Sequence, residues 1–107
     1  MKILFDQGTP APLRHALVGH VVSTAYDKGW SSLDNGALRR AAEGDGFDVM
    51  ITTDQSLRHE QNLSTMRMAI VVLPTTSWPR IQRHAKIVLD VVNAIKPSEI
   101  VDVVLPE

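Results

Sequence analysis

The sequence predicts a single α/β domain, a three-layer α/β/α sandwich around a mainly parallel five-stranded sheet. Short and almost uninterrupted apolar runs recur along the 107 residues, which is typical of strands buried on both faces of a parallel sheet. Segments with helix signals separate these runs, and such alternation calls for right-handed crossover connections. A chain of this length buries roughly two thirds of its unfolded surface. We therefore expect one domain over residues 1–107.

Five segments have the composition of strands. They are rich in Val, Ile and Leu and are bounded by polar or turn-forming residues. The last but one is the most apolar, and we expect it at the centre of the sheet. In chain order the predicted strands are residues 2–5, 20–25, 48–54 with Asp54 at the carboxyl end, 68–73 and 100–105.

The first predicted helix is short. Thr9 is placed to cap its start, Pro10 fits the first helical position, and Gly19 is placed to end it in a left-handed conformation. Leu13 and Leu17 give it one apolar side. The order of the predicted elements along the chain indicates that this helix connects the first two strands.

Two further helices are predicted. One begins between residues 32 and 35 and ends at 43 or 44, with Leu38, Ala41 and Ala42 facing inward and Arg39 and Arg40 facing outward. The other runs from about residue 79 to 95 after a cap at Ser77. Its apolar residues recur at spacings of four, three, four and three, which indicates one buried helix face: Ile81, Ala85, Val88, Val92 and Ile95.

Composition excludes several classes of function. The chain has no cysteine, which excludes disulfides, thiolate metal sites and cysteine nucleophiles. No glycine-rich phosphate loop, nucleophile elbow or dinucleotide motif is found, and the four histidines lack metal-ligand spacing. The net charge of -1 and pI near 6.4 give no overall attraction to nucleic acid. With no secretory signal or membrane span in the sequence, we expect a cytoplasmic protein.

Two acids follow two of the predicted strands. Asp6 closes the first strand and Asp54 follows the third. If these strands are neighbours, the two carboxylates converge at a separation of about 5 Å and would repel one another without a cation. Mg²⁺ or Mn²⁺ would resolve this repulsion and act on a phosphate group. The alternative is that each aspartate only caps the turn that follows it.

Polar residues near the two acids form a second group of candidates. Asp34 and Asn35 begin a predicted helix and could supply a third ligand, or could serve only as helix caps. Amides, hydroxyls and a guanidinium could contact RNA or the waters around an ion, although a solvated loop would look the same. Trp30 and Trp78 could stack on bases or could cover the edge of the core. The remaining candidates are Gln7, Thr53, Gln55, Ser56, Arg58, His59, Gln61 and Asn62.

The chain resembles a known family in several short motifs. These are residues 2–7 followed by Pro10, the Gly-His-Val-Val of residues 19–22, the Ile-Thr-Thr-Asp-Gln of 51–55, Asn35-Gly36, and the Gln-Asn-Leu of 61–63. Together they resemble the small PIN-like proteins, relatives of VapC-type toxins. The resemblance covers essentially the whole chain.

This resemblance implies a metal-dependent ribonuclease that uses clustered acids to bind Mg²⁺ or Mn²⁺ and cleaves RNA with water activated by the ion. Asp6 and Asp54 match the family's acids, and Asp34 falls near a third. Gln7 stands where the family usually has Glu, and Ser56 where a second Asp often follows. The implied partners are RNA and a cognate antitoxin protein, and a homodimer is also compatible.

The sequence is therefore compatible with three functions. The first is the metal-dependent endoribonuclease, with Asp6 and Asp54 as catalytic metal ligands and Asp34 as a third acid. The second is an inactive PIN-like domain that binds RNA or a partner. The third is a receiver-like domain that is phosphorylated on Asp54; it requires a lysine after a late strand, whereas only Pro106 and Glu107 follow the fifth.

Overall fold

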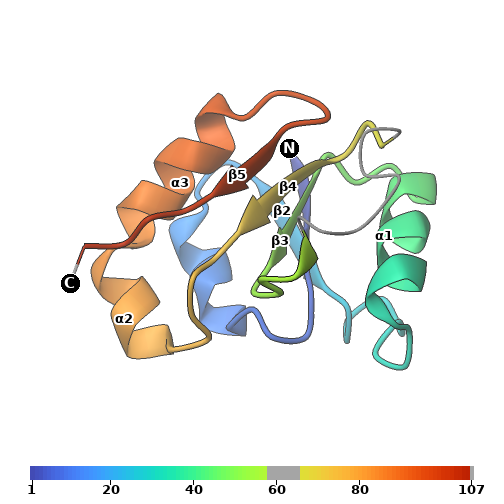
Figure 1. Ribbon diagram of the computed structural model, residues 1–107, viewed down its shortest axis with the longest axis horizontal. Helices are drawn as coiled ribbons and strands as arrows, with labels where there is room; N and C mark the ends of the chain where they lie inside the picture. Colours follow the sequence, from blue (N-terminus) through green and yellow to red (C-terminus); the bar gives the residue numbers. More distant parts are fainter. Residues whose placement is uncertain (58–65, 107) are drawn as a thin grey trace.

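The computed structural model describes residues 1–57 and 66–106. Five strands form one sheet in the order β2-β1-β3-β4-β5, and every neighbouring pair is parallel. This confirms the predicted α/β fold and its parallel sheet (Figure 1). The strands are β1 (Lys2–Phe5), β2 (Val21–Thr24), β3 (Val49–Thr52), β4 (Ala69–Val72) and β5 (Ile100–Asp102).

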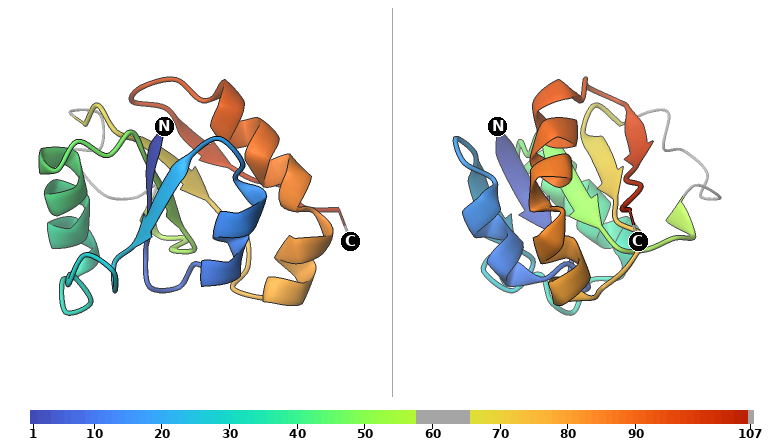
Figure 2. Two further views of the ribbon diagram at one scale, coloured as in Figure 1. Left: turned by 180° about the vertical axis from the view of Figure 1, so that it is seen from behind. Right: turned by 90° about the vertical axis from the view of Figure 1, so that its left-hand side faces the viewer.

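Helices cover both faces of the sheet. Figures 1 and 2 show α1 on one face, with η1, α2 and α3 gathered on the other. Among the described residues no helix is long and apolar enough to cross a membrane. The helices are the 3₁₀ helix η1 (Ala11–Ala16), α1 (Asn35–Gly44), α2 (Trp78–Arg83) and α3 (Ala85–Ala94).

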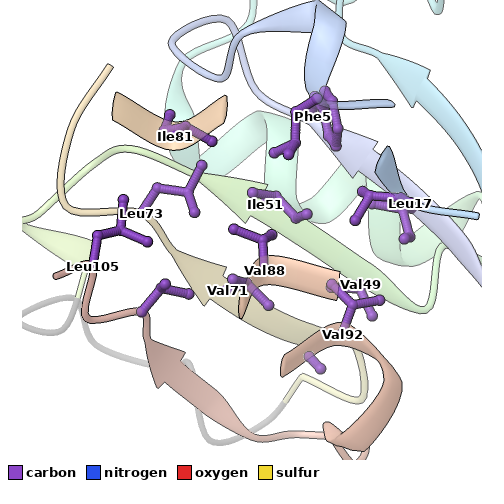
Figure 3. Packing of buried hydrophobic residues seen from close by; sticks show 14 residues of the cluster. Phe5, Leu17, Val49, Ile51, Val71, Leu73, Ile81, Val88, Val92 and Leu105 are labelled. Carbon is purple, nitrogen blue, oxygen red and sulfur yellow. The ribbon is translucent and has the colours of Figure 1, made fainter. Parts of the chain in front are cut away.

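Strand alternation assigns side chains to the two faces. Ile3 and Phe5 of β1 pack with Val49 and Ile51 of β3 beneath η1, α2 and α3 (Figure 3). Leu4 and Met50, at the positions between them, pack on the α1 face. Because successive residues of a strand point to opposite faces, a strand buried on both sides needs the continuous apolar run seen in the sequence.

The sheet centre differs from the prediction. In the observed order β3 is the middle strand and β4 lies between β3 and the edge strand β5. All four residues of both strands are buried. The composition of a strand indicates how buried it is. Because β3 and β4 are equally buried, composition could not show which of them is the middle strand.

The last predicted helix is divided in two. His84 (φ -127°, ψ 27°) lies between α2 and α3, so residues 79–95 are not one continuous helix. The apolar stripe is nevertheless preserved, because Ile81, Val88 and Val92 are all buried. Ser77 caps α2 as predicted by accepting a hydrogen bond from the backbone N of Arg80.

Two further boundaries differ. The fifth strand ends at Asp102 instead of residue 105, although Val103 and Leu105 remain buried. Thr9 does not cap η1, whose N-cap position is Pro10 without a side-chain hydrogen bond. Gly19 has the predicted left-handed conformation (φ 88°), but η1 ends at Ala16 with Leu17 as its C-cap.

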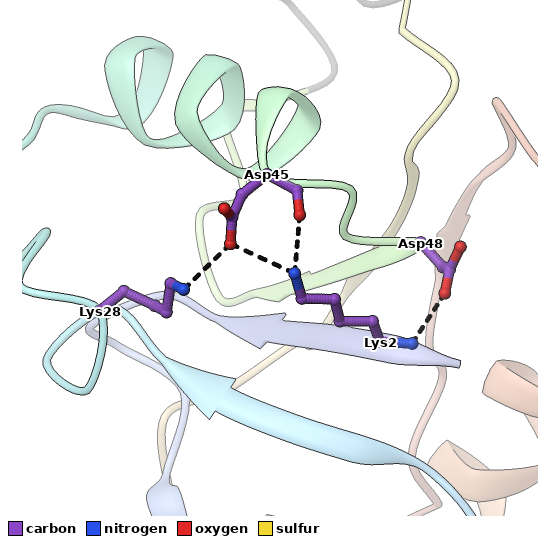
Figure 4. A network of polar contacts seen from close by, with 4 residues as sticks. All are labelled: Lys2, Lys28, Asp45 and Asp48. Carbon is purple, nitrogen blue, oxygen red and sulfur yellow. Dashed lines mark hydrogen bonds and ion pairs between the residues drawn. The ribbon is translucent and has the colours of Figure 1, made fainter.

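A polar cluster joins the last turn of α1 to β1. The Nζ atoms of Lys2 and Lys28 lie 3.2 and 3.0 Å from Oδ2 of Asp45 (Figure 4). The ammonium of Lys2 also lies 4.4 Å from the ring centroid of Phe47. These exposed pairs contribute little individually, but they hold the C-terminal end of α1 at the amino end of β1. The N-terminus of α1 therefore lies toward the carboxyl ends of the strands.

Candidate functional site

The two acids singled out in the sequence follow neighbouring strands. β1 pairs with β3, as the metal-site prediction required, with Phe5 opposite Ile51. Asp6 therefore stands level with Thr52, and Asp54 lies two residues further along the chain. β3 ends at Thr52, so the two acids do not occupy paired positions of the two strands.

Asp6 is held by hydroxyl and amide donors. Its Oδ1 accepts hydrogen bonds from the backbone N and Oγ1 of Thr9, at 3.1 and 2.6 Å. Its Oδ2 accepts one from Oγ1 of Thr52. Only 8% of Asp6 is exposed. These donors explain why Thr9 does not cap η1: its side chain is turned back to the carboxylate that precedes it.

Asp54 lies in a second set of donors. Its Oδ1 accepts hydrogen bonds from the backbone N and Oγ of Ser56, at 3.0 and 2.6 Å. Its Oδ2 accepts one from Nδ2 of Asn35, at 2.7 Å. Asn35 is the first residue of α1, and a helix N-terminus favours a nearby carboxylate.

These contacts lower the pKa of Asp54. The largest contribution is the hydrogen bond from the Ser56 hydroxyl, which outweighs the opposing effect of burial. The backbone N–H of Ser56, the positive charge of Arg39 and the amide of Asn35 add to it. Asp54 is therefore a carboxylate at neutral pH.

Thr52 connects the two acids. Its hydroxyl donates to Asp6 and accepts a 3.0 Å hydrogen bond from the backbone N of Asp54. Thr52 is 1% exposed; its bond to Asp6 is buried and its bond to Asp54 is partly buried. One buried hydroxyl thus fixes the position of the first carboxylate and the backbone of the second.

Arg39 corrects the prediction for α1. It was expected to face outward with Arg40, but only 6% of it is exposed, and its charge helps to lower the pKa of Asp54. A signal was present in the sequence, because Arg39 follows Asn35 by four residues and residues at this spacing share a helix face. The helix face that contains Leu38 and Ala42 is apolar, and this suggested instead that a charged arginine would not be buried on it.

Asp34 serves as the N-cap of α1. Its Oδ1 accepts a 2.8 Å hydrogen bond from the backbone N of Ala37, and its backbone O accepts from Leu38 N. This matches the capping alternative that the sequence left open. The structure shows no contact of Asp34 with Asp6 or Asp54 among the bonds described for those acids.

The other candidates are dispersed along the same edge. Nε2 of Gln7 donates to the backbone O of Ser31, and Nε2 of Gln55 donates to the backbone O of Leu73. Both amides therefore brace loops. Thr53 lies against Gly8, because a Cβ added to Gly8 would collide with the Oγ1 atom of Thr53. Four candidates lie outside the described residues: Arg58, His59, Gln61 and Asn62.

The two carboxylates would offer a divalent ion only a few ligands. Each of the two carboxylates accepts three of the described hydrogen bonds, out of roughly four lone-pair positions. Within residues 1–57 and 66–106 no group of three or more acidic or histidine side chains gathers closely enough to hold a metal. Mg²⁺ commonly keeps several waters and uses one or two carboxylates together with a substrate phosphate. Asp6 and Asp54 would be the carboxylates that take part in such a site.

Removing the Ser56 hydroxyl should raise the pKa of Asp54, because that hydroxyl is the largest cause of its lowering. Since the folded pKa is depressed, the ionised carboxylate stabilises the fold at pH values above its unfolded pKa of about 3.9. This stabilisation is lost as the pH falls through the lower, folded pKa. NMR titration of the Asp54 carboxyl carbon in parent and Ser56→Ala protein measures the change.

Asp27 provides the internal control for that titration. Its pKa is lowered by a hydrogen bond from the backbone of Thr24 and by Arg14, groups that the Ser56→Ala change does not touch. The Asp27 titration should therefore stay where it is while that of Asp54 moves to higher pH. An unchanged Asp54 curve would contradict the assigned cause.

Comparison with known proteins does not assign this chain to a family. No protein-family model matches the chain, and no curated protein or solved structure is significantly similar to it.

Proposed function

We propose that this chain is a PIN-like endoribonuclease that depends on Mg²⁺ or Mn²⁺ and acts as the toxin of a toxin–antitoxin pair. The observation that carries the proposal is the Thr52 hydroxyl, which joins Asp6 to the backbone of Asp54 at the carboxyl edge of the sheet. Ligands of open α/β sheets bind at this edge. The order and spacing of the motifs that resemble PIN-like proteins support RNA as the substrate and an antitoxin protein as the partner.

Each residue of the site has a defined part in this proposal. Asp6 and Asp54 hold the ion, and their hydrogen bonds keep both carboxylates oriented before it arrives. Asn35 positions Asp54 from the start of α1. When bound, the ion supplies stabilisation of the charge that develops on the phosphate and activates the attacking water. Arg39 adds a positive charge close to Asp54, where it favours an anionic substrate.

Metal dependence of cleavage tests this function. Purified protein is incubated with a mixed-sequence single-stranded RNA in EDTA, in Mg²⁺ and in Mn²⁺, and the products are separated by size. We expect internal cleavage with either metal and none in EDTA. RNA that stays intact under all three conditions contradicts the proposal, and so does equal cutting with and without EDTA.

An inactive, binding-only domain is a second candidate. It is favoured by the three hydrogen bonds that already engage each carboxylate and by Gln7 and Ser56 at positions where the resembling family has acids. Isothermal titration with Mn²⁺ distinguishes the two. Mn²⁺ binding that is lost in Asp54→Asn favours the nuclease, whereas absence of binding to the parent protein favours the inactive domain.

A receiver-like phosphoacceptor is a third candidate, favoured by topology. The strand order 2-1-3-4-5 is also that of receiver domains, in which the acids lie after the first and third strands. The residues after β5 are Val103, Val104, Leu105, Pro106 and Glu107, so the lysine that would pair with a phosphoryl group is absent from that position. Intact-mass measurement after incubation with acetyl phosphate decides: a phosphate adduct supports this candidate, and an unchanged mass eliminates it.

A further inference from the structure

A cleft adjoins the site on the side of Asp6. It has a volume of about 780 Å³, is open to solvent, and is lined by the loop after β1, by η1, by the residues that follow β2 and by the first turn of α2. Asp6 lies in its wall, together with Tyr26 and Trp78. Cavities of this size commonly bind small molecules or single groups of larger ones. Any group held here would lie beside the proposed metal ligand.

The charges in the cleft do not favour a bare anion. Nη2 of Arg14 lies 2.8 Å from Oδ2 of Asp27, and both residues line the cleft. The hydrogen bond from the Thr24 backbone, together with Arg14, lowers the pKa of Asp27, so this ion pair persists at neutral pH. Asp6 then adds negative charge. A neutral group with hydrogen-bonding edges is therefore better suited to the cleft than a phosphate.

Two aromatic side chains make the cleft suitable for a flat group. Tyr26 is 83% exposed, so its ring is accessible for stacking on a bound group. Trp78 is half-buried and packs on the main core, so its position is fixed. Trp30, the other tryptophan, packs edge-on against Phe47 with ring centroids 6.1 Å apart and belongs to the α1 face. The sequence could not separate these two tryptophans, whereas the structure gives only Trp78 a place beside the cleft.

We propose that this cleft binds one unpaired nucleobase of a single-stranded RNA, with Tyr26 as the stacking surface and Trp78 as a wall. The inference rests on the proposed function, since Asp6 then places the metal and the scissile phosphate next to the bound base. Aromatic stacking tolerates any base because every base has a π face. The enzyme would consequently select unpaired RNA by the accessibility of a base and not by overall charge attraction, in agreement with the chain's net charge of -1.

Binding of hexauridylate RNA in EDTA tests the inference without cleavage. Labelled RNA is titrated by fluorescence polarisation with parent protein and with Tyr26→Leu and Tyr26→Phe proteins. Loss of the ring should weaken binding by about 5- to 100-fold, while Tyr26→Phe should bind within about twofold of the parent because it retains the ring. Val104→Ala, at another exposed apolar residue (81% exposed), is the control and should bind like the parent.

Trp78 gives a second and independent readout. In Trp30→Phe protein Trp78 is the only tryptophan, and its fluorescence should change on addition of hexauridylate but not of an abasic oligonucleotide of equal length. Equal binding of the abasic oligonucleotide, or unchanged affinity in Tyr26→Leu, overturns the inference.

The outcomes also separate this inference from the proposed function. RNA that binds in a Tyr26-dependent way but is never cut with Mg²⁺ or Mn²⁺ supports the base cleft and contradicts the nuclease. Metal-dependent cutting that is equal in parent and Tyr26→Leu protein supports the nuclease and overturns the base cleft.

Discussion

Replacement of Asp54 by asparagine is expected to reduce metal-dependent RNA cleavage by at least about 100-fold, since even residues that only support metal ligands commonly cost 10–100-fold. The substitution removes the charge needed to hold the cation. It retains an oxygen that can accept the hydrogen bonds from Ser56, and the amide of Asn35 can turn to face the new side chain. The fold should therefore survive. The measurement is the initial cleavage rate at saturating Mn²⁺, with circular dichroism to confirm folding.

Asp34→Asn is the matched control for this experiment. It makes the same chemical change at an acid only twenty residues earlier in the sequence, but Asp34 acts as a helix N-cap, a role that asparagine fills equally well. Cleavage and stability should both be retained. Full activity in Asp54→Asn would refute the metal-ligand role, and equal loss in both variants would show that Asp34 is a ligand as well.

The second large effect is expected for Thr52→Val, which preserves the shape of the side chain and deletes its hydroxyl. Asp6 then loses a buried donor and the backbone N of Asp54 loses its acceptor. Hydrogen bonds to charged groups contribute about 1.5–3 kcal/mol, and an unsatisfied buried group costs about 1–3 kcal/mol. We expect the free energy of unfolding to fall by about 2–4 kcal/mol, measured by urea denaturation.

Thr52→Ser distinguishes the hydroxyl from the packing around it. Serine retains the donor and acceptor and loses only a methyl group, which costs about 1 kcal/mol when buried. Stability should therefore follow the order parent, Thr52→Ser, Thr52→Val. If Thr52→Val is as stable as the parent, the hydroxyl does not hold the two acids together and the geometry of the site has another origin.

Much of the fold was predictable because burial leaves a strong pattern in sequence. The apolar runs of β1, β3 and β4 become the strands of a parallel sheet covered on both faces. The break at His84 was not predictable, because the apolar spacing continues through it from Ile81 to Val88. The apolar spacing shows which helix face is buried. Two consecutive helices that lie in line can bury this face just as one continuous helix can.

The sequence singled out two acids at the ends of strands, but it could not give the geometry around them. The strands that precede Asp6 and Asp54 are neighbours, as the metal-site prediction required, whereas the two-residue offset depends on register, which sequence does not specify for a strand buried on both faces. The roles of Thr52 and Ser56 were missed because the role of a hydroxyl depends on its hydrogen-bond partners, which the sequence does not show. Ser56 was considered as one of several polar candidates and as a residue standing in place of an acid, and the structure makes it the main hydrogen-bond donor to Asp54.

The location of a bound Mn²⁺ ion tests the central claim most directly. A crystal of this protein soaked in Mn²⁺ can be measured at a wavelength where manganese scatters anomalously. We predict one anomalous peak within about 2.0–2.6 Å of a carboxylate oxygen of Asp6 or Asp54, a usual range for oxygen ligands of divalent cations, with water completing the coordination. Fully occupied Mn²⁺ at other residues only, with neither carboxylate contacted, would contradict the assignment of these two acids as the metal site.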